Sequence, residues 1–373
     1  MKRIVFYILF LLTLVSTSTF AQDTDEASAA TSAFADSLNT MPTEKKKTKN
    51  FRNTLKKIIR GFSSVDTNYI EPQHYVMQTM LQGTYTYERY TVGTDNGEEI
   101  EFAPEPSLKI GPYIGWKFLF WGYTFDVYHM EEDNRKEYSL NLYSSQIGID
   151  LFYRKTGSNY KIKRMSYDND KIPEMHNVRF DGFHASIKGF NLYYITNHRK
   201  FSYPAAFAQS TVQRRSCGSP MFGIGYMRHT LDIDWKKLSE LTTKRMGEDQ
   251  SMVVDSNIVS GKVKYTDFSL TGGYGYNWVF AKNWLFSGSL SLGLAYKRAT
   301  ADNEHSGFDL KNFRLTNFNL DGVGRFAIVW NTTKWFAGAS TVIHTYNYHK
   351  QQFSTNSMFG NLKIYIGMNF WRK

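Results

Sequence analysis

Four long stretches in which apolar and polar residues alternate constrain this chain more than any other feature. In residues 284–297, one face is apolar and has an aromatic residue near each end, Trp284 and Tyr296. The opposite face carries mainly serine, glycine and lysine. A period of two is that of a β-strand whose two faces meet different surroundings. The other stretches lie at 268–280, 318–330 and 361–370.

The length of these stretches separates a membrane barrel from a soluble β-sandwich. Sandwich strands usually have about 5 or 6 residues, whereas these stretches keep their phase over about 10 to 15. The chain is 16% aromatic, yet it has no apolar run long enough to cross a membrane as a helix. Such alternation is typical of strands that face lipid on one side and a polar lumen on the other. The sequence therefore predicts an all-β fold, a transmembrane antiparallel outer-membrane β-barrel.

Counting strands inward from both ends predicts about 12 strands. Short turns alternate with longer polar connections along the chain, as they do in barrels with short periplasmic turns and longer outer loops. Residues 155–258 must hold an odd number of strands if the total is even; three strands give 12, and one gives the alternative of 10. We also expect a helix at 235–246, in the longest outer loop. The expected strands are 74–92, 107–119, 122–128, 138–154, 159–166, 184–196, 218–233, 259–280, 284–298, 314–330, 335–349 and a C-terminal strand.

The N-terminal residues predict export. Residues 1–21 begin with two basic residues, continue with an apolar run of about a dozen residues and end in small residues, which is typical of a cleavable signal peptide. Residues 22–43 are rich in Ser, Thr, Ala and Asp and predict a disordered linker. Residues 44–70 are interpreted as a basic periplasmic segment and 71–373 as the barrel domain. The expected location is the outer membrane of a Gram-negative bacterium.

The basic segment contains an expected short amphipathic helix, since its apolar residues fall at the spacing of one helical face. Such a helix could lie on anionic lipid, but docking on the barrel rim or in the lumen is the preferred interpretation. Expected partners are outer-membrane lipid, lipopolysaccharide and the barrel-assembly machinery. Nucleic acid is not expected despite the net charge of +11, because export removes that partner. The basic residues are Lys45, Lys46, Lys47, Lys49, Arg52, Lys56, Lys57 and Arg60.

Residues 197–219, between two expected strands, are too long and polar for a simple turn. They include the cations His198, Arg199, Lys200, Arg214 and Arg215. One hypothesis is a constriction that selects anions, as rings of basic residues do in anion pores. The preferred hypothesis is a plug whose cations pair with carboxylates of the lumen wall. The charged wall candidates are Asp126, Asp150, Asp267, Asp321, Arg325 and Lys363.

Enzymatic chemistry has little support in the sequence. A lipid hydrolase would need a serine beside a histidine, and the only dense neighbourhood is His198 with Ser202, Ser210 and Ser216. The chain has no GxSxG, HExxH or phosphate-binding glycine loop, and its single cysteine, Cys217, excludes an intrachain disulfide. We therefore assign no catalytic residue, metal site or cofactor, and we expect a protein that is not an enzyme.

Two segments resemble a known family. The run FSYPAAFAQSTVQRRSCGS within 197–219 and the stretch GIDLFYRKTG at 148–157 are similar to a DUF4421-like family of exported or outer-membrane proteins of Bacteroidetes, whose domain has no assigned function. The resemblance implies an envelope location and supplies no functional residues. The sequence favours a channel or solute-passage barrel. The alternatives are a closed structural or surface-binding barrel that acts through its loops or periplasmic helix, and a lipid-modifying hydrolase.

Overall fold

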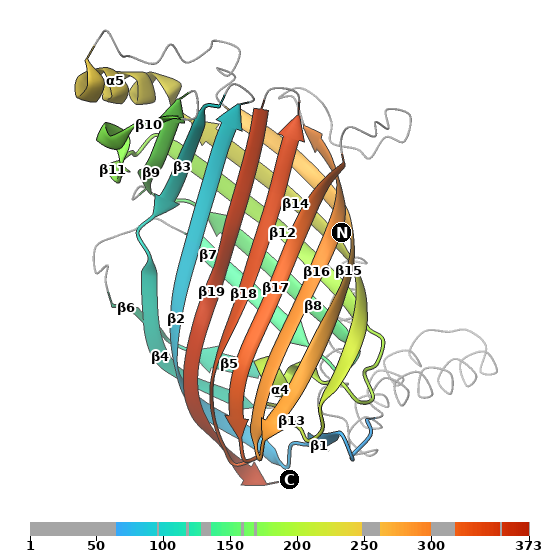
Figure 1. The fold of residues 1–373 in the computed structure, drawn as a ribbon. Helices are drawn as coiled ribbons and strands as arrows, with labels where there is room; N and C mark the ends of the chain where they lie inside the picture. The colour runs from blue at the N-terminus through green and yellow to red at the C-terminus, as the bar shows by residue number, and fades with distance from the viewer. Residues whose placement is uncertain are drawn as a thin grey trace, which may run out of the picture.

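The computed structural model shows an antiparallel β-sheet that curves into a barrel (Figure 1). Each strand pairing among the described residues is antiparallel. None of the described helices is long and apolar enough to cross a membrane. The structure describes residues 65–94, 97–116, 119–127, 136–157, 160–167, 170–247, 262–299, 318–350 and 353–372.

The barrel wall contains long strands that neighbour one another in chain order. Starting from β7, the paired order is β7, β8, β12, β14 to β19, β2 and β4, and β4 then pairs with β5 and β6. The strands are β2 (Tyr75–Thr94), β4 (Ser107–Trp116), β5 (Leu119–Gly122), β6 (Phe125–Asp126), β7 (Lys136–Tyr143), β8 (Ile147–Lys155), β12 (Phe183–Ile195), β14 (Cys217–Ile233), β15 (Lys262–Ala281), β16 (Trp284–Ala299), β17 (Phe318–Asn331), β18 (Trp335–Lys350) and β19 (Phe353–Arg372).

The wall has one place where the described residues form no strand pairing. Strand β7 pairs with β8 on one edge, and β5 and β6 pair with β4. Within the described residues, no register joins β5 or β6 to β7. We call this place the β6–β7 seam.

Short elements gather at the two ends of the barrel (Figure 1). At one end, the α5 end, β3 pairs with β2 and β9, and β9 pairs with β10 and β11. At the other, the plug end, β1 pairs with β13. The α5-end elements are β3 (Glu99–Pro104), β9 (Tyr160–Tyr167), β10 (Asp170–Lys171), η1 (Pro173–Met175), β11 (Val178–Arg179) and α5 (Trp235–Met246). The plug-end elements are β1 (Ile70–Pro72), α4 (Tyr203–Phe207) and β13 (Thr211–Gln213).

The expected helix at 235–246 is confirmed as α5. The Asp234 side chain caps it by accepting a hydrogen bond from the Lys237 backbone nitrogen at 3.1 Å. The helix ends at Met246, and the next residue, Gly247, caps it with a φ of 89° that glycine easily adopts. The sequence thus marked both ends of this helix.

Two strand predictions were wrong. The stretch 138–154 forms a hairpin, β7 and β8, rather than one strand. Its turn is made by Ser144, whose hydroxyl accepts a hydrogen bond from Ile147 N at 2.9 Å, and it contains no glycine or proline that would have marked it. Strand β9 pairs with β3, which lies in an expected loop at 93–106, and not with β12, because β12 pairs directly with β8. A total of 12 wall strands therefore requires that β7 and β8 are counted separately and that β9 is left out of the wall.

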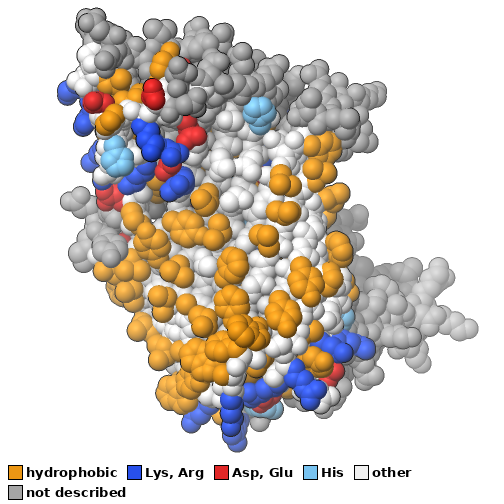
Figure 2. Space-filling view, viewed as in Figure 1, with side chains coloured by type: hydrophobic (Ala, Val, Ile, Leu, Met, Phe, Trp, Pro, Cys, Tyr) orange, Lys and Arg blue, Asp and Glu red, His pale blue; other side chains and the backbone are white. Residues whose placement is uncertain are grey.

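The outer face of the wall is apolar over much of its height (Figure 2). On β16, Leu290, Leu292 and Leu294 are each at least half exposed on this face, while Ser287 and Ser289 are buried inside. Charged side chains gather instead near β3 and β9 and at the plug end (Figure 2). The alternation read from the sequence therefore separates an apolar exterior from a polar interior.

The α5 end of the lumen is filled by a hydrophobic core. Buried aromatic residues from different strands pack there, with Phe102 and Phe183 stacked at 4.4 Å between ring centroids and Tyr90 at 5.3 Å from Phe183. Leu238 of α5 is fully buried in the same cluster. This end of the bore is therefore packed with side chains.

Candidate functional site

The segment between β12 and β14, residues 196–216, folds into the plug end of the barrel; we call it the plug. Its helix α4 begins at Ser202, whose hydroxyl accepts a hydrogen bond from Ala205 N at 3.2 Å, with Pro204 in the first turn. Tyr203, Ala205 and Ala206 are at most 1% exposed. A five-residue helix is stable here because the wall surrounds it.

The plug contacts the wall on several sides. The Tyr203 hydroxyl donates to Ser289 Oγ on β16 at 2.7 Å. The Gln209 amide donates to the Tyr365 hydroxyl on β19 at 2.6 Å. Apolar contacts join the two alanines of α4 to residues of β16 and β17, Leu285, Ala327 and Val329. These contacts hold the helix within the lumen.

Gln213 on β13 is the centre of the plug's polar contacts. Its amide nitrogen lies within hydrogen-bond distance of the carbonyl oxygens of Tyr69, Lys200 and Arg215, at 2.6 to 3.2 Å. Its Oε1 accepts from Ser202 N and from Asn277 Nδ2 on β15, both at 3.0 Å. Gln213 is only 3% exposed. One neutral side chain therefore links the plug, the strand before β2 and the wall.

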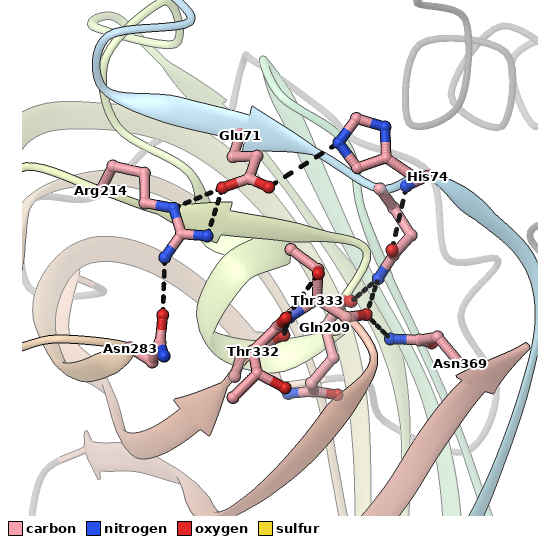
Figure 3. Close-up of polar contacts among 10 residues, drawn as sticks. Glu71, His74, Gln209, Arg214, Asn283, Thr332, Thr333 and Asn369 are labelled. Atoms are coloured by element: carbon pink, nitrogen blue, oxygen red, sulfur yellow. Dashed lines mark hydrogen bonds and ion pairs between the residues drawn. The ribbon is translucent and has the colours of Figure 1, made fainter.

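The rim of the plug is tied to the turns of the wall (Figure 3). Arg214 pairs with Glu71 on β1 and donates to Asn283 Oδ1 in the β15–β16 turn at 2.8 Å. The Gln73 amide nitrogen donates to the Thr333 carbonyl at 3.2 Å, and Asn369 Nδ2 donates to the same carbonyl at 2.7 Å. Residues before β2 therefore hold the plug against the end of the barrel.

The other predicted plug cations do not line the lumen. Arg199, Lys200 and Arg215 are exposed, and the last two lie over the ring of Tyr69 at 5.0 and 5.8 Å. His198 is half-buried, its Nε2 accepts from the Gln146 amide at 2.7 Å, and burial lowers its pKa below the usual value. Hydration of these cations at the barrel end accounts for their outward position. The described residues therefore form neither a cationic constriction nor ion pairs between plug cations and lumen carboxylates.

The lumen carboxylates Asp150 and Asp321 pair with cations of the wall itself, and Asp267 and Asp126 contact other polar side chains of the wall. Asp150 on β8 pairs with Arg325 on β17, and both side chains are almost fully buried. Asp321 accepts from Lys297 Nζ at 2.7 Å. Asp267 lies 3.4 Å from His229 Nε2 in a fully buried contact, and Asp126 accepts from Ser107 Oγ at 2.9 Å.

Arg154 on β8 spans the seam side of the lumen. Its guanidinium donates to Glu88 on β2 at 2.9 Å and to Glu137 on β7 at 2.6 Å. Arg154 and Glu88 are at most 4% exposed. A buried bridge therefore connects β2 with β7 and β8, although β2 is paired with neither of them among the described residues.

A cavity of about 990 Å³ lies between β2 and β4 on one side and β7 and β8 on the other. Phe207, Ala208 and Gln209 of the plug form part of its lining. Lys363, a predicted lumen residue, also lines it, together with Lys109. The structure thus places Lys363 with the plug and the seam rather than with the plug cations.

A hydrolase site is not assembled in the part of the chain that the structure describes. None of Ser202, Ser210 and Ser216 is hydrogen-bonded to His198; Ser202 contacts Thr211, and Ser216 Oγ accepts from Val279 N. The described residues also contain no group of three His, Cys, Asp or Glu side chains that could hold a metal ion. The expected signal peptide, linker and basic helix, from Lys45 to Arg60, lie outside the described residues.

The sequence predicted the plug but not the residues that hold it in the lumen. The prediction emphasised charge, whereas Tyr203, Gln213 and Asn277 are neutral. The Ser-Tyr-Pro order at 202–204 is a helix-start signal that was available. Asn277 stands between Tyr276 and Trp278 on the inward face of its strand, so its burial also follows from alternation.

Comparisons with known proteins support a family assignment. No curated protein matches the chain. Among solved structures, the chain is similar to the P. putida toluene transporter TodX (8% identity, 80% of this chain and 91% of that chain, TM-score 0.22). It is also similar to the transport unit of the Escherichia coli autotransporter AIDA-I (9%, 79% and 90%, TM-score 0.29) and to the Pseudomonas aeruginosa outer membrane protein OprG (10%, 80% and 98%, TM-score 0.19).

A family model matches most of the chain. Its match covers residues 64–370, which include each described strand almost completely. The resemblance seen in the two sequence segments is thereby confirmed. The chain belongs to the family defined by the domain of unknown function DUF4421.

Proposed function

We infer that this chain is an outer-membrane β-barrel of 12 wall strands, closed at rest by its plug, that passes a solute by way of the cavity beside the seam. The 12 strands are β2, β4, β5 continued by β6, β7, β8, β12 and β14 to β19. This count takes β7 and β8 as two strands and leaves β9 outside the wall. An even number is usual for a closed bacterial barrel.

The apolar exterior supports the membrane location. On β16, Trp284 and Tyr296 bound the apolar face and are separated by about 40 Å of extended chain. A strand tilt of about 40° reduces this to about 30 Å, close to the apolar band of outer-membrane barrels. Trp278, Trp335 and Trp371 are exposed at the same end as Trp284, as aromatic girdle residues are.

The plug end is proposed to face the periplasm. The connections at this end include the two-residue turn between β15 and β16 and the three-residue turn between β17 and β18. Bacterial barrels have short turns on the periplasmic side. This orientation places the plug between the cavity and the periplasm.

The observation that carries the proposal is the position of α4. Phe207 lines the cavity, while its neighbours in the helix pack against the wall. Withdrawing the plug would therefore connect the cavity with the periplasmic end. The paired charges deeper in the lumen favour a second candidate, a permanently closed structural barrel.

Planar-bilayer conductance distinguishes the two candidates. The refolded full-length chain is compared with a deletion of 197–216 and with a Tyr203→Ala/Gln209→Ala variant, which keeps the whole segment. All three carry Phe102→Ala and Phe183→Ala, because the hydrophobic core otherwise closes the α5 end of the bore. We expect no steady current from the full-length chain and measurable current from both variants. Lys334→Ala, at an exposed turn, is the control and should remain silent. Heat-modifiable gel migration checks that each protein is folded.

Either of two other results would contradict the proposal. Steady current through the full-length chain would mean that the plug does not close the bore. Silence in folded forms of both plug variants would mean that no path lies behind the plug, which is the result expected for the structural barrel.

A further inference from the structure

A row of inward-facing polar side chains crosses four strands at the cavity. Ser340, Lys363, Thr84 and Lys109 are consecutive register partners on β18, β19, β2 and β4. All four line the cavity. The two lysines flank Thr84, and their Cα atoms are about 10 Å apart because neighbouring strands lie about 5 Å apart. Their long side chains can therefore reach one anion held between them.

The two lysines have no ion pair among the described residues. The acids that interact electrostatically with Lys363 are Glu137 and Asp150. Each already pairs with an arginine, Glu137 with Arg154 and Asp150 with Arg325. Asp126 is the cross-strand neighbour of Lys109 and accepts a hydrogen bond from Ser107. The row is therefore a set of cationic and hydroxyl donors for which the described residues supply no anionic partner.

The row lies at the same height along the barrel axis as the apolar outer surface. Leu362 and Ile364, on either side of Lys363, are exposed on the outer face, and Ile110 beside Lys109 is exposed in the same way. A cation without a partner at this depth is costly and is a functional-site signal. An anion bound between the lysines would offset that cost.

The cavity reaches β7 at the edge of the strand that has no pairing among the described residues. Glu137 and Asn141 belong to the inward face of this strand, whereas Tyr138 and Leu140 are 65% and 47% exposed on the outer face. Residues from both faces line the same cavity. The cavity therefore extends from the lysine row to apolar residues of the outer face of β7.

We propose that this cavity binds an anionic amphiphile with one acyl chain. Its acidic head, a carboxylate or a phosphate, contacts Lys109, Lys363 and Thr84. Its chain lies along Leu140 and Leu151 at the seam. The volume of about 990 Å³ is at the upper end of the range for small-molecule sites. This inference deepens the proposed function by naming the class of solute.

Fluorescence binding tests the inference with the full-length chain in a non-ionic detergent. The probe is dansyl-aminoundecanoic acid, whose emission rises when it leaves water. We expect saturable binding that weakens about tenfold or more in Lys109→Gln/Lys363→Gln, because two charged contacts are lost. Lys109→Arg/Lys363→Arg should retain binding. Lys282→Gln/Lys334→Gln, at turns of the wall, removes the same charge and should leave binding unchanged.

Competitors identify what the site recognises. Dodecyl phosphate should displace the probe, whereas dodecyltrimethylammonium, which has the same tail and the opposite charge, should not. Equal displacement by inorganic phosphate would overturn the amphiphile in favour of a free anion. Unchanged binding in the folded double glutamine variant would overturn the role of the lysines.

The position of the acyl chain is tested by a separate variant. Leu140→Trp places a larger side chain in the part of the cavity assigned to the chain and should weaken probe binding, while the lysine row stays intact. Unchanged binding would overturn the assigned position of the chain. A steady current through the full-length chain would contradict the proposed function alone, and absent probe binding in a silent barrel would contradict this inference alone.

Discussion

Strands β14 to β19 and strands β4 to β8 form two parts of the same wall, and they differ in strand length and in pairing. Strands of the first part have 14 to 20 residues, and each is paired along both edges. Strands of the second part have 2 to 10 residues and include the β6–β7 seam. Lys297 on β16 pairs with Asp321, whereas Lys109 on β4 and Lys363 on β19, which both line the cavity, have no ion pair among the described residues.

The difference suggests a division of roles. Continuous pairing satisfies backbone groups that would otherwise face lipid, so the first part supplies the stable wall. The second part leaves an edge and a cavity, and it is held to the first part by buried charges that cross the lumen. The predictions below test whether the two parts respond differently to matched changes.

The largest effect is expected where the two parts meet in the lumen. Arg325→Met leaves the Asp150 carboxylate buried without its cation, at a cost of about 3–5 kcal/mol. Guanidinium unfolding of the refolded barrel in vesicles measures the change. The control is Asp150→Leu/Arg325→Met, which removes both charges and should be more stable than the single variant. A double variant at least as unstable as the single one would mean that the cost does not come from a buried carboxylate left without its cation.

The next effect compares the lipid-facing surfaces of the two parts. Leu290→Arg places a charge at the middle of the apolar face of β16 and should cost about 2–4 kcal/mol of unfolding free energy in vesicles. Leu140→Arg, beside the seam, should cost less, because the cavity lets the guanidinium reach polar groups. Equal costs at the two sites would mean that Leu140 meets lipid as Leu290 does.

The sequence predicted the first part of the wall far better than the second. Alternation is unambiguous on strands such as β16, because lipid and lumen impose opposite polarity over many residues. It fails around Ser144, where a polar turn divides a hairpin that reads as one strand. It finds β9 but does not show that this strand pairs with β3, which lies far from it in the chain.

The candidate site was only partly predictable for a similar reason. Position in the chain identified the plug, and inward phase identified Lys363. The partners of Gln213 come from segments distant in sequence, and the register that aligns Lys363 with Lys109 depends on two strand pairings. Neither feature has a local sequence signal.

Loss of the central amide should loosen the plug without unfolding either part of the wall. Gln213→Ala removes buried hydrogen bonds to the plug and to Asn277, which should lower the local stability of α4 by about 1–3 kcal/mol. Hydrogen exchange at the α4 amides measures this change, with the amides of β16 as an internal reference. Arg215→Ala, an exposed change in the same segment, should leave exchange unaltered. Equal acceleration in α4 and β16 would indicate general destabilisation instead.

The smallest effect is expected at the surface ion pairs near the α5 end. These exposed pairs join the same types of side chain as the buried Arg154 bridge. Arg164 pairs with Glu99 between β9 and β3, but both side chains are at least 40% exposed, whereas Arg154 is 4% exposed in the lumen. Arg164→Ala should therefore change the unfolding free energy by about 0–1 kcal/mol, since solvent already screens the pair. Raising the salt concentration should reduce even this difference, while leaving the larger cost of Arg154→Ala nearly unchanged. If the two substitutions cost the same and depend equally on salt, the Arg154 bridge is solvated, and the seam is open to water rather than closed by buried charge.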